Sequence, residues 1–211
     1  MNIIPVEPIV LAIGDQPTGA FDAEFVDDRG DVADAPADAL TGELVTAGSA
    51  PDRYPVAIER GAADEPIAVH WPDLAPLTIA GVLRITVRGN GVRVGTLRLV
   101  VEDYTTGWLT IDDVRARTSW ADAPDDDVTL YEVLEAARVA CINWAPALPE
   151  GELPPANYLI AQLMQARSVW NSVKSGPGDQ IGADGFTVRV FPLDATVKAQ
   201  LRPKRALPVI R

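Results

Sequence analysis

The residues whose side chains could do chemistry are few in this chain and far apart. The single histidine, His70, has no serine, cysteine or metal-spaced partner near it, so it is a weak catalytic candidate. The single cysteine, Cys141, excludes an internal disulfide. A reactive thiol would need an exposed, cationic setting, so we interpret Cys141 as a small buried side chain. This pattern predicts neither an enzyme active site nor a cofactor.

Two further clusters could bind ligands, and both have simpler explanations. The run Asp125–Asp127 could coordinate a divalent cation through its oxygens. It also follows a proline and precedes an apolar-periodic segment, where acids cap the positive end of a helix, and we favour capping over a metal site. The glycine-rich segment 176–178 is not followed by Gly-Lys-Ser/Thr, so it does not predict a phosphate loop.

The basic end of the chain is the candidate partner interface. Residues 153–211 hold eight bases and three acids, whereas residues 107–152 hold three bases and ten acids. We expect this end to become ordered on assembly, against an acidic surface of a neighbouring copy or another protein. The alternative is that it folds back on the chain's own acidic helix, which starts at Asp125. The candidate residues are Lys198, Arg202, Lys204, Arg205 and Arg211.

Two amphipathic segments organise the second half. Apolar residues recur every three or four positions in each, which predicts two helices joined by a short Pro/Gly linker. A short linker favours antiparallel packing with the two apolar stripes buried together. The first stripe is Leu130, Leu134, Ala137, Cys141 and Trp144, and the second is Leu159, Leu163, Ala166, Trp170 and Val173.

The first half is typical of an all-β domain. Short runs rich in Val, Ile, Leu and Thr alternate with Gly, Pro, Asp and Asn. Gly89-Asn90-Gly91 predicts a turn that joins Leu83–Val87 and Val92–Val101 into a hairpin. About seven such strands in about 100 residues predict an immunoglobulin-like β-sandwich in architecture, without the cysteine pattern of antibody domains.

These patterns predict an α+β chain of two domains. Residues 1–106 form the β-sandwich, and residues 107–211 form a helical domain. Within the second domain, Thr110 is placed to cap a short helix. A flexible loop is expected at 175–185, a short strand at Phe186–Val190 and a closing helix at Leu193–Leu201, ahead of the basic tail.

Composition limits the class of protein. The net charge of −12 disfavours attraction of nucleic acid to the body of the chain. The first residues of the chain lack the basic region with which a secretory signal begins, and their longest apolar run is far too short to cross a bilayer. We therefore expect a soluble protein made in a cytoplasm, with no membrane partner.

The second half resembles the head-tail connector (adaptor) proteins of tailed bacteriophages. The resemblance lies in the order of its parts. A short helix over Trp108–Val114 comes first. An Asp-rich start then leads into a helix over Leu130–Arg138, and a further helix begins near Pro155–Tyr158. A Gly-rich loop, a strand and a basic Lys/Arg-Pro end follow. The chain as a whole resembles the actinobacteriophage type, in which a β-rich domain comes first.

This resemblance implies a structural virion protein at the head-tail interface, the neck. Such adaptors form a homo-oligomeric ring, usually of twelve copies, beneath the portal protein and next to a head-tail stopper or tail terminator. DNA passes through the ring without sequence-specific binding, and the family has no catalytic residues to carry over. The alternative from the residues themselves is a monomeric surface- or carbohydrate-binding module, with Trp71, Tyr54 and Trp108 as stacking candidates.

Overall fold

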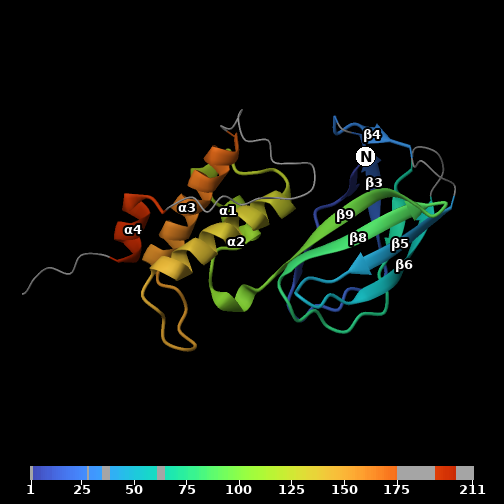
Figure 1. Ribbon diagram of the computed structural model, residues 1–211. Helices are drawn as coiled ribbons and strands as arrows, with labels where there is room; N and C mark the ends of the chain where they lie inside the picture. Colours follow the sequence, from blue (N-terminus) through green and yellow to red (C-terminus); the bar gives the residue numbers. More distant parts are fainter. Residues whose placement is uncertain (1, 28, 35–38, 61–64, 175–192, 203–211) are drawn as a thin grey trace, which may run out of the picture. The chain divides into compact units, whose positions relative to one another are not determined.

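The computed structural model describes residues 2–27, 29–34, 39–60, 65–174 and 193–202. The chain divides into two compact units, Met1–Tyr104 and Thr105–Arg211 (Figure 1). Within the described residues the first unit consists of strands, and the α-helices all belong to the second.

The first unit contributes nine strands to one sheet. Their lengths range from two residues in β4 to eleven in β9. The strands are β1 (Asn2–Pro5), β2 (Val10–Ala12), β3 (Ala20–Val26), β4 (Val32–Ala33), β5 (Leu40–Val45), β6 (Arg53–Arg60), β7 (Ile67–His70), β8 (Gly81–Gly89) and β9 (Val92–Glu102).

These strands form a single curled, mixed sheet, so the prediction of an immunoglobulin-like sandwich is wrong. Their order is β1-β3-β7-β6-β5-β8-β9-β2, and β4 pairs with β3 beside this path. Strand β6 pairs with β5 on one side and with β7 on the other, which joins the strands into one half-barrel. Only the β2–β9 pair among the described ladders is parallel. A sandwich instead needs two separate sheets packed face to face.

The curl brings the first strand against the ninth. Ile3 of β1 packs onto Gly95 of β9, where an added Cβ atom would lie 2.7 Å from the Ile3 Cδ1 and Cγ1 atoms. A larger residue at this position would force the Ile3 side chain or its strand to shift. The first strand lies at one end of the sheet path and β2 at the other, so the chain crosses from edge to edge within its first residues.

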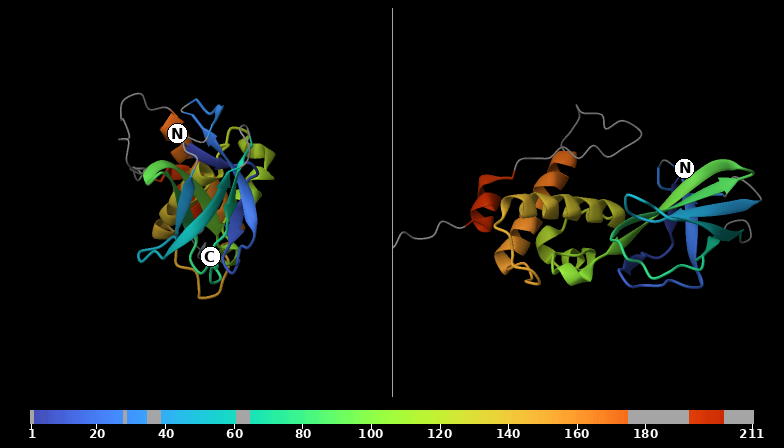
Figure 2. Two further views of the ribbon diagram at one scale, coloured as in Figure 1. Left: turned by 90° about the vertical axis from the view of Figure 1, so that its right-hand side faces the viewer. Right: turned by 60° about the horizontal axis from the view of Figure 1, so that its bottom comes forward.

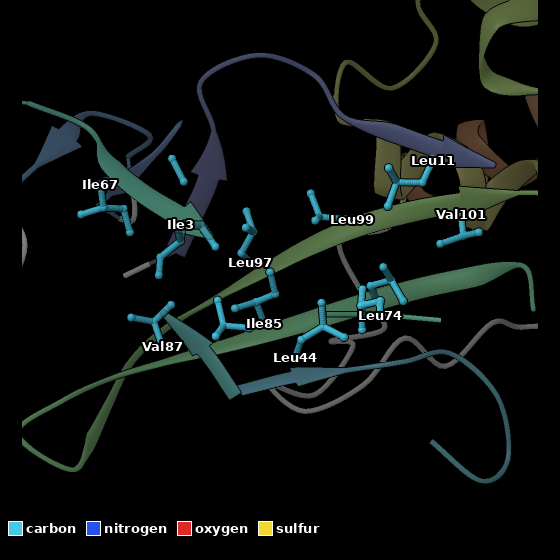
Figure 3. Close-up of a cluster of buried hydrophobic side chains, with 14 of the residues drawn as sticks. Ile3, Leu11, Leu44, Ile67, Leu74, Ile85, Val87, Leu97, Leu99 and Val101 are labelled. Atoms are coloured by element: carbon cyan, nitrogen blue, oxygen red, sulfur yellow. The ribbon is translucent and has the colours of Figure 1, made fainter. Parts of the chain in front are cut away.

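The interior of the half-barrel is a continuous apolar core. Figure 3 shows side chains of β1, β2, β5, β7, β8 and β9 converging there, with Leu74 from the segment before β8. Alternate residues of β8 and β9 point inward, as the period of two requires: Leu83, Ile85 and Val87, and Leu97, Leu99 and Val101, are each no more than 1 % exposed.

The predicted hairpin between β8 and β9 is confirmed. The two strands pair along their length. At the turn Asn90 has φ of 50° and Gly91 has φ of 82°. Two consecutive left-handed residues are the signature of a type I′ turn, whose twist matches that of the strands.

The second unit is helical in its described residues (Figure 2). Its α-helices and the 3-10 turns η1 and η2 are η1 (Tyr104–Thr106), α1 (Ile111–Arg115), η2 (Thr118–Trp120), α2 (Asp127–Trp144), α3 (Ala156–Lys174) and α4 (Ala195–Leu201). Thr110 caps α1 as predicted, in a capping box with Asp113. The predicted loop 175–185 and the strand Phe186–Val190 lie outside the described residues.

Helices α2 and α3 pack together and run in opposite senses. Tyr158 near the start of α3 bonds to Pro146 just after α2, whereas Trp170 near its end bonds to Asp122 before α2. The predicted stripe of α2 is buried up to Cys141, but Trp144 is 36 % exposed.

The predicted stripe of α3 is wrong at four of its five positions, because the helix buries an adjacent face; Ala166 is buried as predicted. Leu159, Leu163 and Trp170 are only half-buried, and Val173 is exposed. The buried face is Tyr158, Ala161, Gln162, Gln165, Ala166 and Val169.

Two glutamines at the centre of this face explain the rotation. The Gln162 side chain is 1 % exposed. Its Oε1 accepts a hydrogen bond from the backbone N–H of Leu109, at 2.9 Å, and its Nε2 donates to the carbonyl of Leu134, at 3.3 Å. One side chain thus joins the segment before α1, helix α2 and helix α3. Gln165, one turn later, is equally buried, yet its Oε1 has no hydrogen-bond partner in the described part of the chain.

Candidate partner interface

Helix α4 carries the described part of the predicted interface. The Asp194 carboxylate begins the helix by accepting a hydrogen bond from the Thr196 N–H at 2.6 Å, and this bond lowers the pKa of Asp194. Val197 and Leu201 are buried against a cluster that includes Trp108 and Tyr158. Because residues four apart share a helix face, Lys198 and Arg202 lie together on a different face from this buried pair.

Both cations lie over one aromatic ring. The Lys198 Nζ atom is 4.8 Å, and the Arg202 Cζ atom 5.0 Å, from the centre of the Trp144 ring. Trp144 is the last residue of α2, where the helix dipole is negative and favours nearby cations. Each cation–π contact of this exposed kind contributes about 0.5–1 kcal/mol. The arrangement holds two positive charges at the surface in a defined place.

The structure therefore assembles two of the five predicted interface residues. Lys198 and Arg202 come together over Trp144, at the C-terminal end of the helix on which the fold-back alternative places the tail and away from the acidic start of that helix. Lys204, Arg205 and Arg211 lie outside the described residues. Sequence reasoning missed Trp144, which it assigned to a buried stripe. No local spacing links a tryptophan to cations more than fifty positions later.

The opposite end of α2 is acidic and is organised by capping. The Asp126 carboxylate accepts a hydrogen bond from the Thr129 N–H at 2.7 Å, as an N-cap. Arg115 forms an ion pair with Asp127 at 2.9 Å and donates to the carbonyl of Asp125 at 2.7 Å. Among the described residues, no group of three or more His, Cys, Asp or Glu side chains is placed to hold a metal ion.

A second ion pair holds the chain at this end of α2. The Lys174 Nζ atom lies 3.1 Å from the Asp122 carboxylate, and it lowers the pKa of that carboxyl through a hydrogen bond. Helix α2 has 18 residues, so about 27 Å separates its acidic start from the Lys198–Arg202 pair at its end. Asp125 and Asp126 form no ion pair within the described residues, whereas Asp127 and Asp122 do. Negative charge therefore remains at the start of α2, opposite the Lys198–Arg202 pair at its end.

The other sequence candidates have structural roles. His70 lies 3.4 Å from Glu59 on the neighbouring strand. The Trp71 ring is tilted against that of Phe21, with ring centres 5.1 Å apart, and it packs with Tyr54 against the half-barrel core. Trp108 is buried beside Tyr158. The three aromatic side chains considered for carbohydrate stacking therefore serve the cores of the two units.

Comparison with known proteins gives no assignment. No family model matches the chain, and no curated protein matches it in sequence. None of the described helices is long and apolar enough to span a membrane.

The Cys141 thiol is predicted to be unreactive in the native protein. Burial raises its pKa to about 12, so its thiolate fraction is about a thousand-fold below that of an ordinary thiol. Ellman's reagent at pH 8 should label the native chain at a small fraction of the rate seen in urea. The unfolded thiol ionises near its ordinary pKa while the native thiol keeps its proton, so the free energy of unfolding should fall as pH rises from about 9 to 12.

The Cys141→Ala variant isolates this effect. Other groups also titrate at high pH, so the informative quantity is the difference in pH slope between wild type and variant. We expect the variant to show a shallower decline above pH 9. Equal slopes, or rapid labelling of the native thiol, would contradict the assignment of Cys141 to the core.

Proposed function

We propose that this chain is a structural virion protein, a head-to-tail adaptor whose helical unit forms a ring beneath the portal of a tailed phage. Two features support this proposal. The order of helices and the basic end resemble the adaptor family. In the described residues, the polar side chains of the helical unit act in capping, ion pairing and packing, and none forms a nucleophile–base pair.

The observation that carries the proposal is the charge polarity along α2. A head-to-tail contact between copies needs two different surfaces on one molecule that complement each other. The acidic start of α2 and the Lys198–Arg202 pair over Trp144 are such surfaces, at opposite ends of one helix. Charge complementarity contributes partner choice and orientation more than affinity. Where the rotation between successive copies closes, a head-to-tail contact of this kind forms a ring.

The overall charge suits a passage for DNA. The net charge of −12 provides few phosphate contacts, so DNA moving through a ring of such subunits would not be held by them. We propose that the ring is part of the virion neck, next to the portal and to a stopper or terminator protein. In this proposal the half-barrel unit makes outward contacts with neighbouring virion proteins.

Charge reversal at the Lys198–Arg202 pair, which we call the basic pole, tests the proposal. Portal-containing heads are mixed with the full chain, and the occupancy of the neck is counted by electron microscopy. We expect wild type to bind and the Lys198→Glu/Arg202→Glu variant to lose at least tenfold in occupancy. Arg117→Glu, which reverses an exposed charge outside the Lys198–Arg202 pair, is the control. It adds negative charge before the acidic start of α2, so it should bind at least as well as wild type.

A compensating change identifies the contact. Adding Asp125→Lys to the double variant restores opposite charges between copies, so we expect neck occupancy to recover in part. Melting temperatures within a few degrees of wild type would show that each variant folds. Wild-type binding by the double variant, or failure of the wild-type chain to join heads, would overturn the proposed function.

A further inference from the structure

The β8–β9 hairpin concentrates positive charge within an acidic unit. Residues 1–106 contain seventeen acids and seven arginines, with no lysine. Four of those arginines lie on the hairpin, and residues 74–101 contain no acid at all. The remaining residues of the unit therefore hold all seventeen acids and three arginines. Such segregation gives one region of the half-barrel the opposite charge to the rest.

The strand register places these arginines on one surface, the outer face of the hairpin. The inward positions of β8 and β9 hold the apolar core (Figure 3), so Arg84, Arg88 and Arg98 at the intervening positions face outward. A register shift between Val87 and Arg88 sets Arg93 opposite Arg88 and so on the same face. Arg84 lies directly opposite Arg98, and Arg88 directly opposite Arg93, with the pair Thr86 and Thr96 between them. Arg84, Arg88 and Arg93 are exposed, and Arg98 is half-buried. We call these four side chains the arginine patch.

This arrangement works against folding. Like charges that face each other across a strand pair destabilise it. Two of the arginines bond to neutral oxygens: the Arg93 Nη2 donates to Thr96 at 2.7 Å, and the Arg88 Nη1 to the carbonyl of Gly91 at 3.5 Å. In the described part of the chain, no carboxylate pairs with Arg84, Arg88 or Arg93.

A neighbouring strand pair shows that this sheet can pair its arginines. On β6, Arg53 forms an ion pair with Glu43 of β5 at 2.8 Å, and both side chains are well exposed. On β5, the strand beside β8, the residues opposite the arginines are uncharged. Thr41 lies opposite Arg88 and Val45 opposite Arg84, whereas Glu43 lies opposite Thr86. The one acid among them is the partner of Arg53. Within the described residues, Arg84, Arg88 and Arg93 thus carry charge that no carboxylate neutralises and that another molecule can use.

We propose that the arginine patch docks a carboxylate-rich segment of another protein. Arg84 and Arg88 are four residues apart on one strand, about 13 Å, and the paired strand lies about 5 Å away. A short acidic segment matches this size, and guanidinium groups bind carboxylates in bidentate pairs. A phosphate backbone that extends beyond the patch would come within about 8 Å, the screening length at physiological salt, of the acidic remainder of the unit and would be repelled by it. A short acidic segment stays on the patch. This inference does not depend on the proposed adaptor function.

Fluorescence anisotropy with a labelled octaglutamate peptide tests the inference. The full chain is titrated in 20 mM salt. We expect binding that weakens at least tenfold in the Arg84→Gln/Arg88→Gln/Arg93→Gln variant and that is lost in 0.5 M salt. Arg53→Gln, on the same outer face but paired with Glu43, is the matched control and should bind like wild type. The triple variant should melt at or above the wild-type temperature, because it loses like-charge repulsion.

The remaining outcomes each decide against the inference. Equal peptide binding by wild type and the triple variant would place the site elsewhere. Repeating the titration with the Lys198→Glu/Arg202→Glu chain would then show whether the peptide binds at the basic pole of the helical unit. Tighter patch-dependent binding of a 16-base-pair DNA would make the ligand a nucleic acid. Self-association of wild type that the triple variant lacks would make the occupant a second copy. A lower melting temperature of the triple variant would make the arginines structural.

Discussion

Replacing Gln162 with leucine should lower the free energy of unfolding of the helical unit by about 2–4 kcal/mol. The side chain is buried and satisfies the Leu109 N–H and the Leu134 carbonyl. Leucine has a similar volume but no polar atoms, so these groups would lose a partner at about 1–3 kcal/mol for a buried donor or acceptor. Urea unfolding followed by tryptophan fluorescence measures the effect, since four of the five tryptophans lie in residues 105–211.

Gln165→Leu is the matched control for this prediction. Gln165 lies on the same face of α3 and is equally buried, but its Oε1 has no partner in the described residues. Removing an unsatisfied polar atom from a core is close to neutral or stabilising. We therefore expect Gln165→Leu to cost less than 1 kcal/mol. Equal losses for the two variants would contradict the bridging role of Gln162.

Truncating Leu134 to alanine should cost about 2–5 kcal/mol, the usual range for a fully buried leucine. Leu134 is 3 % exposed and lies mid-helix in α2, and its own backbone carbonyl accepts the hydrogen bond from Gln162. Its removal would leave a cavity between two helices that are held apart by their other side chains. Urea unfolding of the full chain measures the loss at the transition reported by tryptophan.

Leu163→Ala provides the comparison. The sequence pattern assigned Leu163 to the buried stripe of α3, whereas the structure leaves it half-buried. A half-buried leucine can be replaced with less loss of contact, so we expect a cost of about 1 kcal/mol. A larger loss for Leu163→Ala than for Leu134→Ala would mean that the predicted stripe, and not the observed face, forms the interface.

The strands of the first unit were predictable individually, but their pairing was not. The alternation in Leu83–Val87 and the Asn-Gly turn identify a hairpin because both signals are local. A sandwich and a curled sheet both place alternate residues inward. What separates them here is β6 pairing on both sides, and the packing of Ile3 onto Gly95. Those contacts join positions far apart in the sequence, and no local pattern reports them.

The error in α3 has a different physical cause. Periodicity assigns glutamine to the outside of a helix and leucine to the inside. In this unit the segment before α1 leaves the Leu109 N–H in the interior, and a polar side chain from α3 must meet it. The buried Leu109 N–H needs a hydrogen-bond acceptor, and this need turns α3 so that the face with Gln162 is buried instead of the predicted stripe. A glutamine pair one turn apart, Gln162 and Gln165, was the available signal.

The candidate interface was partly predictable. Charge counting identified Lys198 and Arg202 because an acid-free basic end stands out in an acidic chain. Their support by Trp144 depends on how α4 packs at the end of α2, which charge counting does not address. The arginine patch was missed because its four members are dispersed in sequence and gather only through the register of β8 and β9.

The placement of β1 and β2 at the two ends of the sheet path has a consequence for synthesis on the ribosome. These strands emerge first, yet Val10 of β2 pairs with Val100 of β9, ninety residues later. At about 5–20 residues per second, the N-terminal segment waits roughly 5–20 s for its partner strand. During that interval Leu11 of β2 lacks its neighbours on β9. Strand β1 can pair much earlier with β3, although its Ile3 meets Gly95 only when β9 has been made. The half-barrel is therefore a fold in which β2, one of the first strands to be made, is among the last to be paired.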